Sequence, residues 1–395
     1  TLSAATTITT DSAVVLAGNL GGAYALTKAG SSSLTLGGAN SFTGGVTVQG
    51  GTLRVGSDTA LGVGDLFLNT GNVTVSSDSA SARVIGNAFN ISQNITIGDS
   101  SNNGALTFTG AGTLVGNPTV TVPSAVNWTG VIGGSGNLTK AGVGEMTLSG
   151  ANTLSGSVTV TGGTLTLNGG SAIPDTGTVT VNSPATLKLG ANETVGSLDG
   201  SGAINLQGFN LTVGGTLATG VLSGVISGSG GFYRAGSGVT GLSGANTFTG
   251  GVDISAGTVR VGHNSALGTG TLTMTGGTLS SSAAAGAGDR TLTNAYSLSG
   301  SLVLGDATNS GALTWSGGGS LASNVALTTP SAVTFSGSIS GAWSLTKAGS
   351  GALTLGGANT YSGGTTVSAG SVLIGNDTGF GTGLVALNGG VTVSS

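Results

Sequence analysis

The chain has 395 residues, of which 80 are glycine and only 6% are charged, and its formal net charge is −4. No Gly-X-Y period accompanies the glycine, which excludes collagen, and strong helix formers other than alanine and leucine are too scarce for long helices. The nine basic residues are scattered and cysteine is absent, which excludes a nucleic-acid or anionic-membrane surface, disulfides and thiolate metal sites. Because 37% of the residues are apolar and recur at regular spacing, we expect a folded chain rather than a disordered one.

From the N-terminus onward, the first elements are short runs in which two apolar residues flank one other residue. They lie at residues 34–36, 46–48, 53–55, 66–68 and 73–75. Their starts are separated by 12, 7, 13 and 7 residues, so that one full cycle takes 19 or 20 residues. Period-two alternation bounded by glycine and asparagine predicts short strands with one buried face, joined by turns.

The same rhythm continues along the chain. Runs at 158–160, 165–167, 179–181 and 187–189 start 7, 14 and 8 residues apart, and Val367 and Leu387 are again 20 apart. A cycle of about 20 residues with two or three strands is what one coil of a parallel β-helix requires, with each coil resting on its neighbours. We therefore predict an all-β fold, a β-solenoid forming one continuous β-helix over residues 1–395. The alternative is an antiparallel barrel or sandwich, whose two-residue hairpins are mostly missing.

Internal repeats organise the chain at a larger scale. Four close copies cover residues 26–62, 138–174, 232–268 and 345–381. A basic residue marks the same position in each copy: Lys28, Lys140, Arg234 and Lys347. A longer echo links residues 90–99 with 297–306, 207 residues later, which indicates duplication at more than one scale. The chain begins and ends within this pattern, and we expect it to be a segment of a longer repeat protein.

The copy at residues 345–367, reading LTKAGSGALTLGGANTYSGGTTV, resembles the passenger-associated transport repeat of bacterial autotransporter passengers. The third copy departs from the pattern at Tyr233 and Arg234, and the second has Leu154 at the aromatic position. The resemblance implies a right-handed parallel β-helix displayed outside a Gram-negative cell. It also implies export through a C-terminal translocator in the outer membrane, which lies outside this segment.

Candidate catalytic groups are sparse. The 13 acidic residues are spread along the chain, and Asp58, Asp65, Asp99 and Asp306 are interpreted as turn formers. His263, the only histidine, falls at a turn position where no base, nucleophile or zinc partner accompanies it. We therefore expect no catalytic residue, no metal and no cofactor.

Other residues recur at fixed places in the copies. Asn40, Asn152, Asn246 and Asn359 are expected to hold tight turns by hydrogen bonds to local backbone. Phe42, Phe248 and Tyr361 are interpreted as anchors that pack against turns rather than as a sugar platform. Trp128, Trp315 and Trp343 are the candidates for an exposed stacking surface, with core packing as the default.

These observations favour a non-enzymatic extracellular scaffold: a cell-surface stalk, an adhesin body or a self-associating fibre. The expected partners are further copies of the chain, or glycans or proteins of a host or neighbouring cell, and no nucleic acid. Two alternatives stay open, a polysaccharide-active β-helix enzyme and an ice- or crystal-binding surface formed by outward threonine rows.

Overall fold

The computed structural model describes residues 1–215, 219–283 and 286–395. They form two compact units, Thr1–Val195 and Gly196–Ser395, called here the N-terminal and the C-terminal unit. Every regular element in the described ranges is a β-strand, and no helix there is long and apolar enough to cross a membrane. The prediction of one continuous β-helix spans both units and the residues outside the described ranges, and it stays a prediction.

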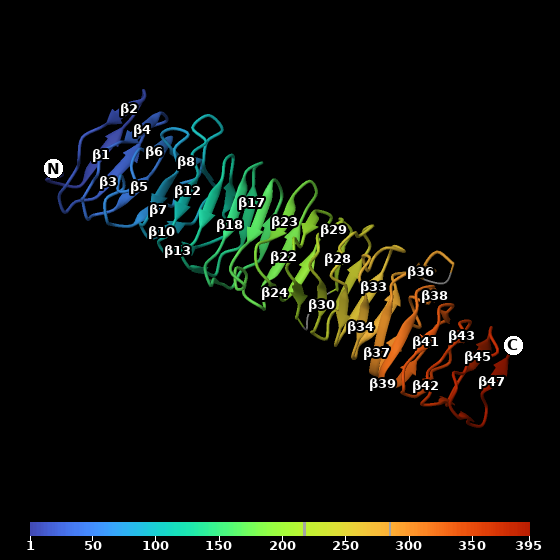
Figure 1. Ribbon diagram of the computed structural model, residues 1–395. Coiled ribbons are helices and arrows are strands. Elements are labelled where there is room, and N and C mark those ends of the chain that lie inside the picture. Colours follow the sequence, from blue (N-terminus) through green and yellow to red (C-terminus); the bar gives the residue numbers. More distant parts are fainter. Residues whose placement is uncertain (216–218, 284–285) are drawn as a thin grey trace. The chain divides into compact units, whose positions relative to one another are not determined.

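In the N-terminal unit, all of whose residues are described, the strands stack into three parallel sheets (Figure 1). The first sheet contains β1 (Thr6–Thr9), β3 (Leu26–Ala29), β5 (Val46–Val48), β7 (Leu66–Leu68), β10 (Phe89–Ile91), β13 (Gly112–Leu114), β16 (Ile132–Gly134) and β19 (Thr153–Leu154). The second contains β2 (Val14–Leu16), β4 (Ser33–Leu36), β6 (Thr52–Val55), β8 (Val73–Ser77), β11 (Ile95–Ile97), β14 (Thr119–Thr121), β17 (Leu138–Ala141), β20 (Val158–Val160) and β22 (Thr178–Val181). The third contains β9 (Arg83–Ile85), β12 (Leu106–Phe108), β15 (Val126–Trp128), β18 (Glu145–Leu148), β21 (Thr164–Leu167) and β23 (Thr186–Leu189), and β24 (Glu193–Val195) ends the unit.

The described strands of the C-terminal unit also pair in parallel along three faces. The first face contains β27 (Leu211–Val213), β30 (Phe232–Arg234), β32 (Val252–Ile254), β34 (Leu272–Met274), the first parts of β37 (Tyr296–Leu304) and β39 (Gly319–Thr328), and β41 (Ile339–Ser340). The second contains β28 (Thr219–Leu222), β31 (Val239–Leu242), β33 (Thr258–Val261), β35 (Thr278–Ser281), the second parts of β37 and β39, β42 (Leu345–Ala348), β44 (Thr365–Val367) and β46 (Val385–Leu387). The third contains β36 (Arg290–Leu292), β38 (Leu313–Trp315), β40 (Val333–Phe335), β43 (Leu353–Leu355), β45 (Ser371–Ile374) and β47 (Thr392–Ser394). The remaining strands are β25 (Ser197–Asp199), β26 (Ala203–Asn205) and β29 (Ile226–Ser227).

The register between neighbouring strands follows the sequence rhythm. Val46 pairs with Leu66, and Val367 pairs with Leu387, both 20 residues later along parallel strands. In β5 the two valines are buried and Thr47 between them is partly exposed. Apolar side chains therefore stack on their equivalents one coil away, and the central residues of the strands face outward. The predicted parallel β-solenoid with about 20 residues per coil is confirmed, and an antiparallel barrel or sandwich is excluded.

The four repeat copies do not all lie on the same face of their unit. In the N-terminal unit the LTKA strand of the first copy, β3, lies in the first sheet, but that of the second copy, β17, lies in the second. In the C-terminal unit β30 lies on the first face and β42 on the second. The basic positions are 112 residues apart in one unit and 113 in the other. Neither interval is a whole number of 20-residue coils, so the second copy in each unit begins one face later.

Candidate functional site

The basic residues of the four copies are the most unusual side chains of the core. Lys28, Lys140, Arg234 and Lys347 lie on β3, β17, β30 and β42, and each is at most 2% exposed. In each strand the basic residue follows a buried apolar residue at an interval of two, so both point to the inside of the coil. Burying a charged side chain is costly unless all its donors find acceptors.

Backbone carbonyl oxygens supply these acceptors. The Lys140 ammonium donates to the carbonyl oxygens of Gly142 at 2.8 Å, Gly144 at 2.6 Å and Gly162 at 2.7 Å. An ammonium group has three donors, so its capacity is filled. The other two lysines do the same at 2.8–3.0 Å: Lys28 with Ala29, Gly30 and Gly50, and Lys347 with Ala348, Gly349 and Ala369. Each ammonium thus joins its own turn to the turn of the next coil.

Arg234 fills the equivalent place with a different reach. Its Nη1 donates to the Val213 carbonyl oxygen at 2.6 Å and its Nη2 to that of Gly215 at 2.9 Å, both in the preceding coil. Its Nε donates to the carbonyl oxygen of Gly238 in its own turn at 3.3 Å. The longer guanidinium therefore joins its turn to the preceding coil, whereas each lysine joins its turn to the next coil. In all four copies the basic residue connects two neighbouring coils.

The buried cations have no carboxylate partner among the described residues. Burial lowers the pKa of all four, and that of Lys140 falls to about 8. A lysine with a lowered pKa can act as a base or nucleophile when substrate can reach it. Here the group is enclosed by carbonyl oxygens inside the coil, so the arrangement serves packing and not chemistry on an external substrate.

The four asparagines join three successive coils. Asn152 Oδ1 accepts from the Ile132 N–H at 2.7 Å, and its Nδ2 donates to the Ala172 carbonyl oxygen at 2.8 Å, 20 residues away on either side. The other three make the same pair of bonds at 2.6–2.8 Å: Asn40 with Leu20 and Ala60, Asn246 with Ile226 and Ala266, and Asn359 with Ile339 and Gly379. The expected local backbone partners are therefore wrong: the amide is used along the stack, between coils.

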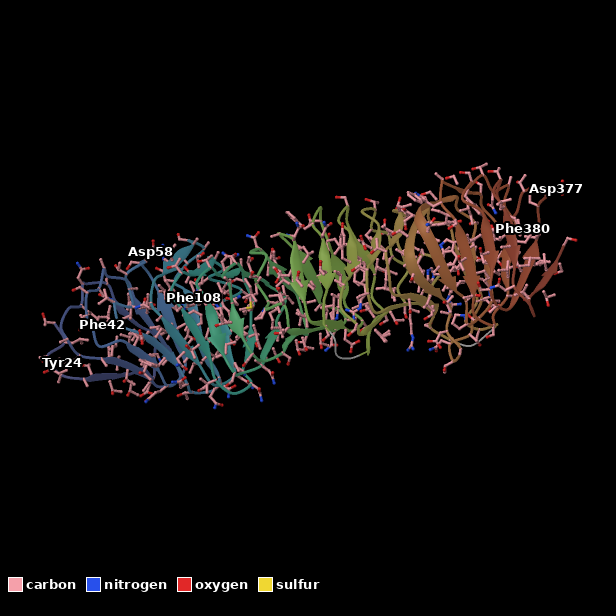
Figure 2. All side chains as sticks on the ribbon, turned by 90° about the horizontal axis from the view of Figure 1, so that it is seen from below. Tyr24, Phe42, Asp58, Phe108, Asp377 and Phe380 are labelled. Carbon is pink, nitrogen blue, oxygen red and sulfur yellow. The ribbon has the colours of Figure 1, made fainter. Side chains whose placement is uncertain are left out.

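The aromatic positions lie in the core beside turns. Phe42, Phe248 and Tyr361 are each 0% exposed. A Cβ added to Gly62, where φ is +64°, would lie 3.0 Å from the Phe42 ring, so the ring covers this turn closely. Phe42 of the N-terminal unit and Phe380 of the C-terminal unit are both labelled in Figure 2. The carbonyl oxygen of Phe380 accepts from the Thr365 hydroxyl, which contacts Tyr361 Oη at 2.6 Å.

The tryptophans divide between core and surface. Trp128 packs against Phe89 with ring centroids 5.4 Å apart, and Trp315 stacks on Phe335 at 5.3 Å. Both indoles are buried, whereas Trp343 is 46% exposed in the turn before the fourth copy. Trp343 alone of the three therefore offers a surface.

The polar turn residues hold backbone. Asp99 Oδ1 accepts from the N–H groups of Ser101 and Asn102, and Asp306 Oδ1 accepts from those of Thr308 and Asn309, as expected of turn formers. Asp58 differs, because its Oδ1 accepts from the Val84 N–H, 26 residues away.

His263 is exposed, and its Nδ1 accepts from the Ser265 N–H at 3.1 Å. Its role therefore matches that of Asn376, whose Oδ1 accepts from the Thr378 N–H in the fourth copy. Across the described ranges no three side chains of the metal-ligating types gather at one point.

Two ionisable residues, Glu193 and Asp253, have surroundings that the sequence pattern did not predict. Glu193 is 2% exposed and accepts from the N–H groups of Ile173 at 2.7 Å and Ala172 at 3.3 Å. Asp253 stands on the outer face of β32, where the other copies have Thr47, Thr159 and Thr366. Alignment of the four copies carried the signal for Asp253, because it is the only charged residue at that position.

Comparison with known proteins agrees with the repeat architecture. The model of the passenger-associated transport repeat matches four times, at residues 26–55, 138–167, 234–261 and 345–374. The chain is therefore a parallel β-solenoid that carries passenger-associated transport repeats, and the predicted resemblance to autotransporter passengers is confirmed.

One curated relative is the adhesin BmaC autotransporter of Brucella suis biovar 1 (strain 1330). It is 34% identical to this chain over 158 residues, which are 39% of the chain and 4% of the relative. The chain thus spans a small part of the length of this relative. No solved structure matches.

Proposed function

We propose that this segment is a non-enzymatic scaffold of a secreted, cell-surface protein: the stalk or body of an adhesin. The repeats of autotransporter passengers and the similarity to part of an adhesin autotransporter support a surface role. The observation that carries the scaffold role is the use made of the repeat's polar groups. The cations and amides repeated in the copies are consumed by bonds between coils, which stiffen the stack.

Surface display can be tested with an antibody raised against the 395-residue segment. The antibody is expected to label intact cells of the source bacterium, and proteinase K added to intact cells is expected to remove the label while a periplasmic marker survives. Labelling that appears only after the outer membrane is opened would contradict surface display.

The non-enzymatic role has a separate test. The purified segment is incubated with a panel of polysaccharides, and new reducing ends and unsaturated products are measured. We expect no product above the level of a heat-denatured sample. Product that scales with the amount of folded protein would favour a polysaccharide-active β-helix enzyme instead.

Self-association into fibres is the finer form of the proposal. Parallel strands at the end of a solenoid leave backbone groups unpaired, which a second copy can pair. Sedimentation and electron microscopy of the native full-length protein distinguish the forms: filaments support a fibre, and monomeric rods at high concentration leave a stalk or adhesin body.

A further inference from the structure

The third repeat copy departs from the others at two outward positions that are neighbours in space. Tyr233 on β30 and Asp253 on β32 are register partners on adjacent parallel strands. The other copies have threonine at both places: Thr27, Thr139 and Thr346 for the first, and Thr47, Thr159 and Thr366 for the second. Register partners lie about 4.8 Å apart, so the two substitutions act on one patch of the sheet face.

A shallow hollow of about 120 Å³ lies at this patch. Tyr233 and Asp253 line it together with Thr271, Thr273 and the glycine pair Gly250-Gly251. The Tyr233 ring lies close over Gly231, where an added Cβ would be 2.9 Å from the ring carbon Cε2. Gly231 and the Gly250-Gly251 pair have no side chains, which leaves room for the ring and for the hollow beside it.

The polar groups around the hollow are not used within the fold. Among the described residues, the Asp253 carboxylate forms no hydrogen bond or ion pair, and the hydroxyl groups of Tyr233, Thr271 and Thr273 form no hydrogen bond. Burial raises the pKa of Asp253, because its carboxylate is partly desolvated without a compensating partner. This contrasts with the buried Glu193, which accepts from two N–H groups.

We propose that this hollow binds one pyranose ring of a neutral saccharide. The Tyr233 ring stacks on the C–H face of the sugar, Asp253 accepts hydrogen bonds from its hydroxyl groups, and the threonine hydroxyls pair with the rest. A ligand with many hydroxyl groups suits a site in which an aromatic ring lies beside threonine hydroxyl groups and one carboxylate. A simple cation does not, because a single half-exposed carboxylate contributes little to ion pairing in water.

Saturation-transfer NMR on the whole 395-residue chain tests the site, with the methyl pyranosides of glucose, galactose, mannose and N-acetylglucosamine as probes. We expect one or more of them to bind. Tyr233→Thr and Asp253→Thr restore the residues of the other copies, so both variants are expected to fold, and each is expected to weaken binding at least tenfold. Tyr24→Thr, which removes an exposed aromatic ring of the N-terminal unit, is the matched control and is expected to leave binding unchanged.

Three outcomes would overturn the proposal: no probe binds, the two threonine variants bind as the parent does, or tetramethylammonium competes and binding falls as NaCl rises. Circular dichroism melting of each variant checks that a loss of binding is not a loss of fold. The site goes beyond the scaffold role, which stands whichever result is obtained.

Discussion

The Lys140 ammonium lies against the backbone of Gly163 in the next coil. A Cβ added to Gly163 would be 2.7 Å from Lys140 Nζ, and the glycine has φ +60°. The fourth copy repeats the relationship, because a Cβ on Gly370 would lie 3.0 Å from Lys347 Nζ. The buried lysine and the glycine of the following turn therefore depend on each other: the turn supplies carbonyl oxygens, and only a residue without a side chain lets them come close enough.

Lys140→Met is expected to destabilise the surrounding coils by about 2–4 kcal/mol, because buried carbonyl oxygens of three glycines lose their donor. Amide hydrogen exchange of β17 and β20 measures the effect locally, since a solenoid unfolds in parts. Lys188→Met is the control. Lys188 is on β23 with 38% of its side chain exposed, and its loss is expected to change stability by less than about 0.5 kcal/mol. Equal exchange in both variants would show that the three hydrogen bonds from the Lys140 ammonium to carbonyl oxygens do not contribute to stability.

Gly163→Ala is expected to cost more in the parent chain than in the Lys140→Met background. In the parent, the new methyl group meets the ammonium and adds to the strain of a positive φ. A methionine side chain can shift away, so that only the backbone strain and the close approach of the methyl group to the carbonyl oxygens of Gly142 and Gly144 stay. A double-mutant cycle on unfolding free energies measures the coupling, which we expect to be on the order of 1 kcal/mol. Strict additivity would refute the mutual dependence.

Asn152→Leu is expected to destabilise the three coils that Asn152 joins by about 2–4 kcal/mol, because the Ile132 N–H and the Ala172 carbonyl oxygen both lose a buried partner. Asn152→Asp keeps the acceptor for Ile132 and loses the donor to Ala172. Protonation of the new carboxyl restores a donor, so this variant is expected to recover at low pH whereas the leucine variant does not. Exchange of the Ile132 amide follows both effects. Asn127→Thr, on the outer face of β15, is the control and is expected to be nearly neutral.

The sequence rhythm was sufficient to predict the architecture for a simple physical reason. Period-two alternation sets which face of a strand is buried, and a constant step of about 20 residues places equivalent residues on neighbouring coils. The same alternation contained the inward direction of Lys28, which follows the buried Leu26 at an interval of two. Burying a charged side chain usually costs free energy, which argues against placing a lysine inside the coil. The backbone carbonyl oxygens that offset this cost cannot be identified from a sequence.

Other features depended on information that the rhythm does not contain. The partners of Asn152 lie 20 residues away on both sides, so they follow from coil register and not from the local turn. The move of the second copy to another face comes from longer coils between the copies, such as the 23-residue step between the register partners Leu66 and Phe89. The hollow at Tyr233 and Asp253 required the pairing of β30 with β32 before the two departures could be placed side by side.

Glu193 is expected to make the coil at its position more stable in acid. Burial raises its pKa from the ordinary 4.5 to about 7, with a smaller contribution from the nearby Asp175 charge, against the opposing effect of two backbone N–H donors. Between these pKa values the folded state binds more protons than the unfolded state, so stability falls as pH rises. The contribution is fully present below pH 4.5 and is lost as pH passes about 7.

Glu193→Gln removes the titrating group, and its stability is expected to be flat over the same pH window apart from the background of other groups. The difference between the parent and this variant should therefore change by up to a few kcal/mol from pH 4.5 to pH 7.5, as expected for a pKa raised from 4.5 to about 7. Exchange of the Ile173 amide, corrected for the intrinsic pH dependence of exchange, measures the change where it arises. A parent whose local stability rises over this range, relative to the variant, would reverse the sign and show that the carboxylate is better solvated than its burial implies.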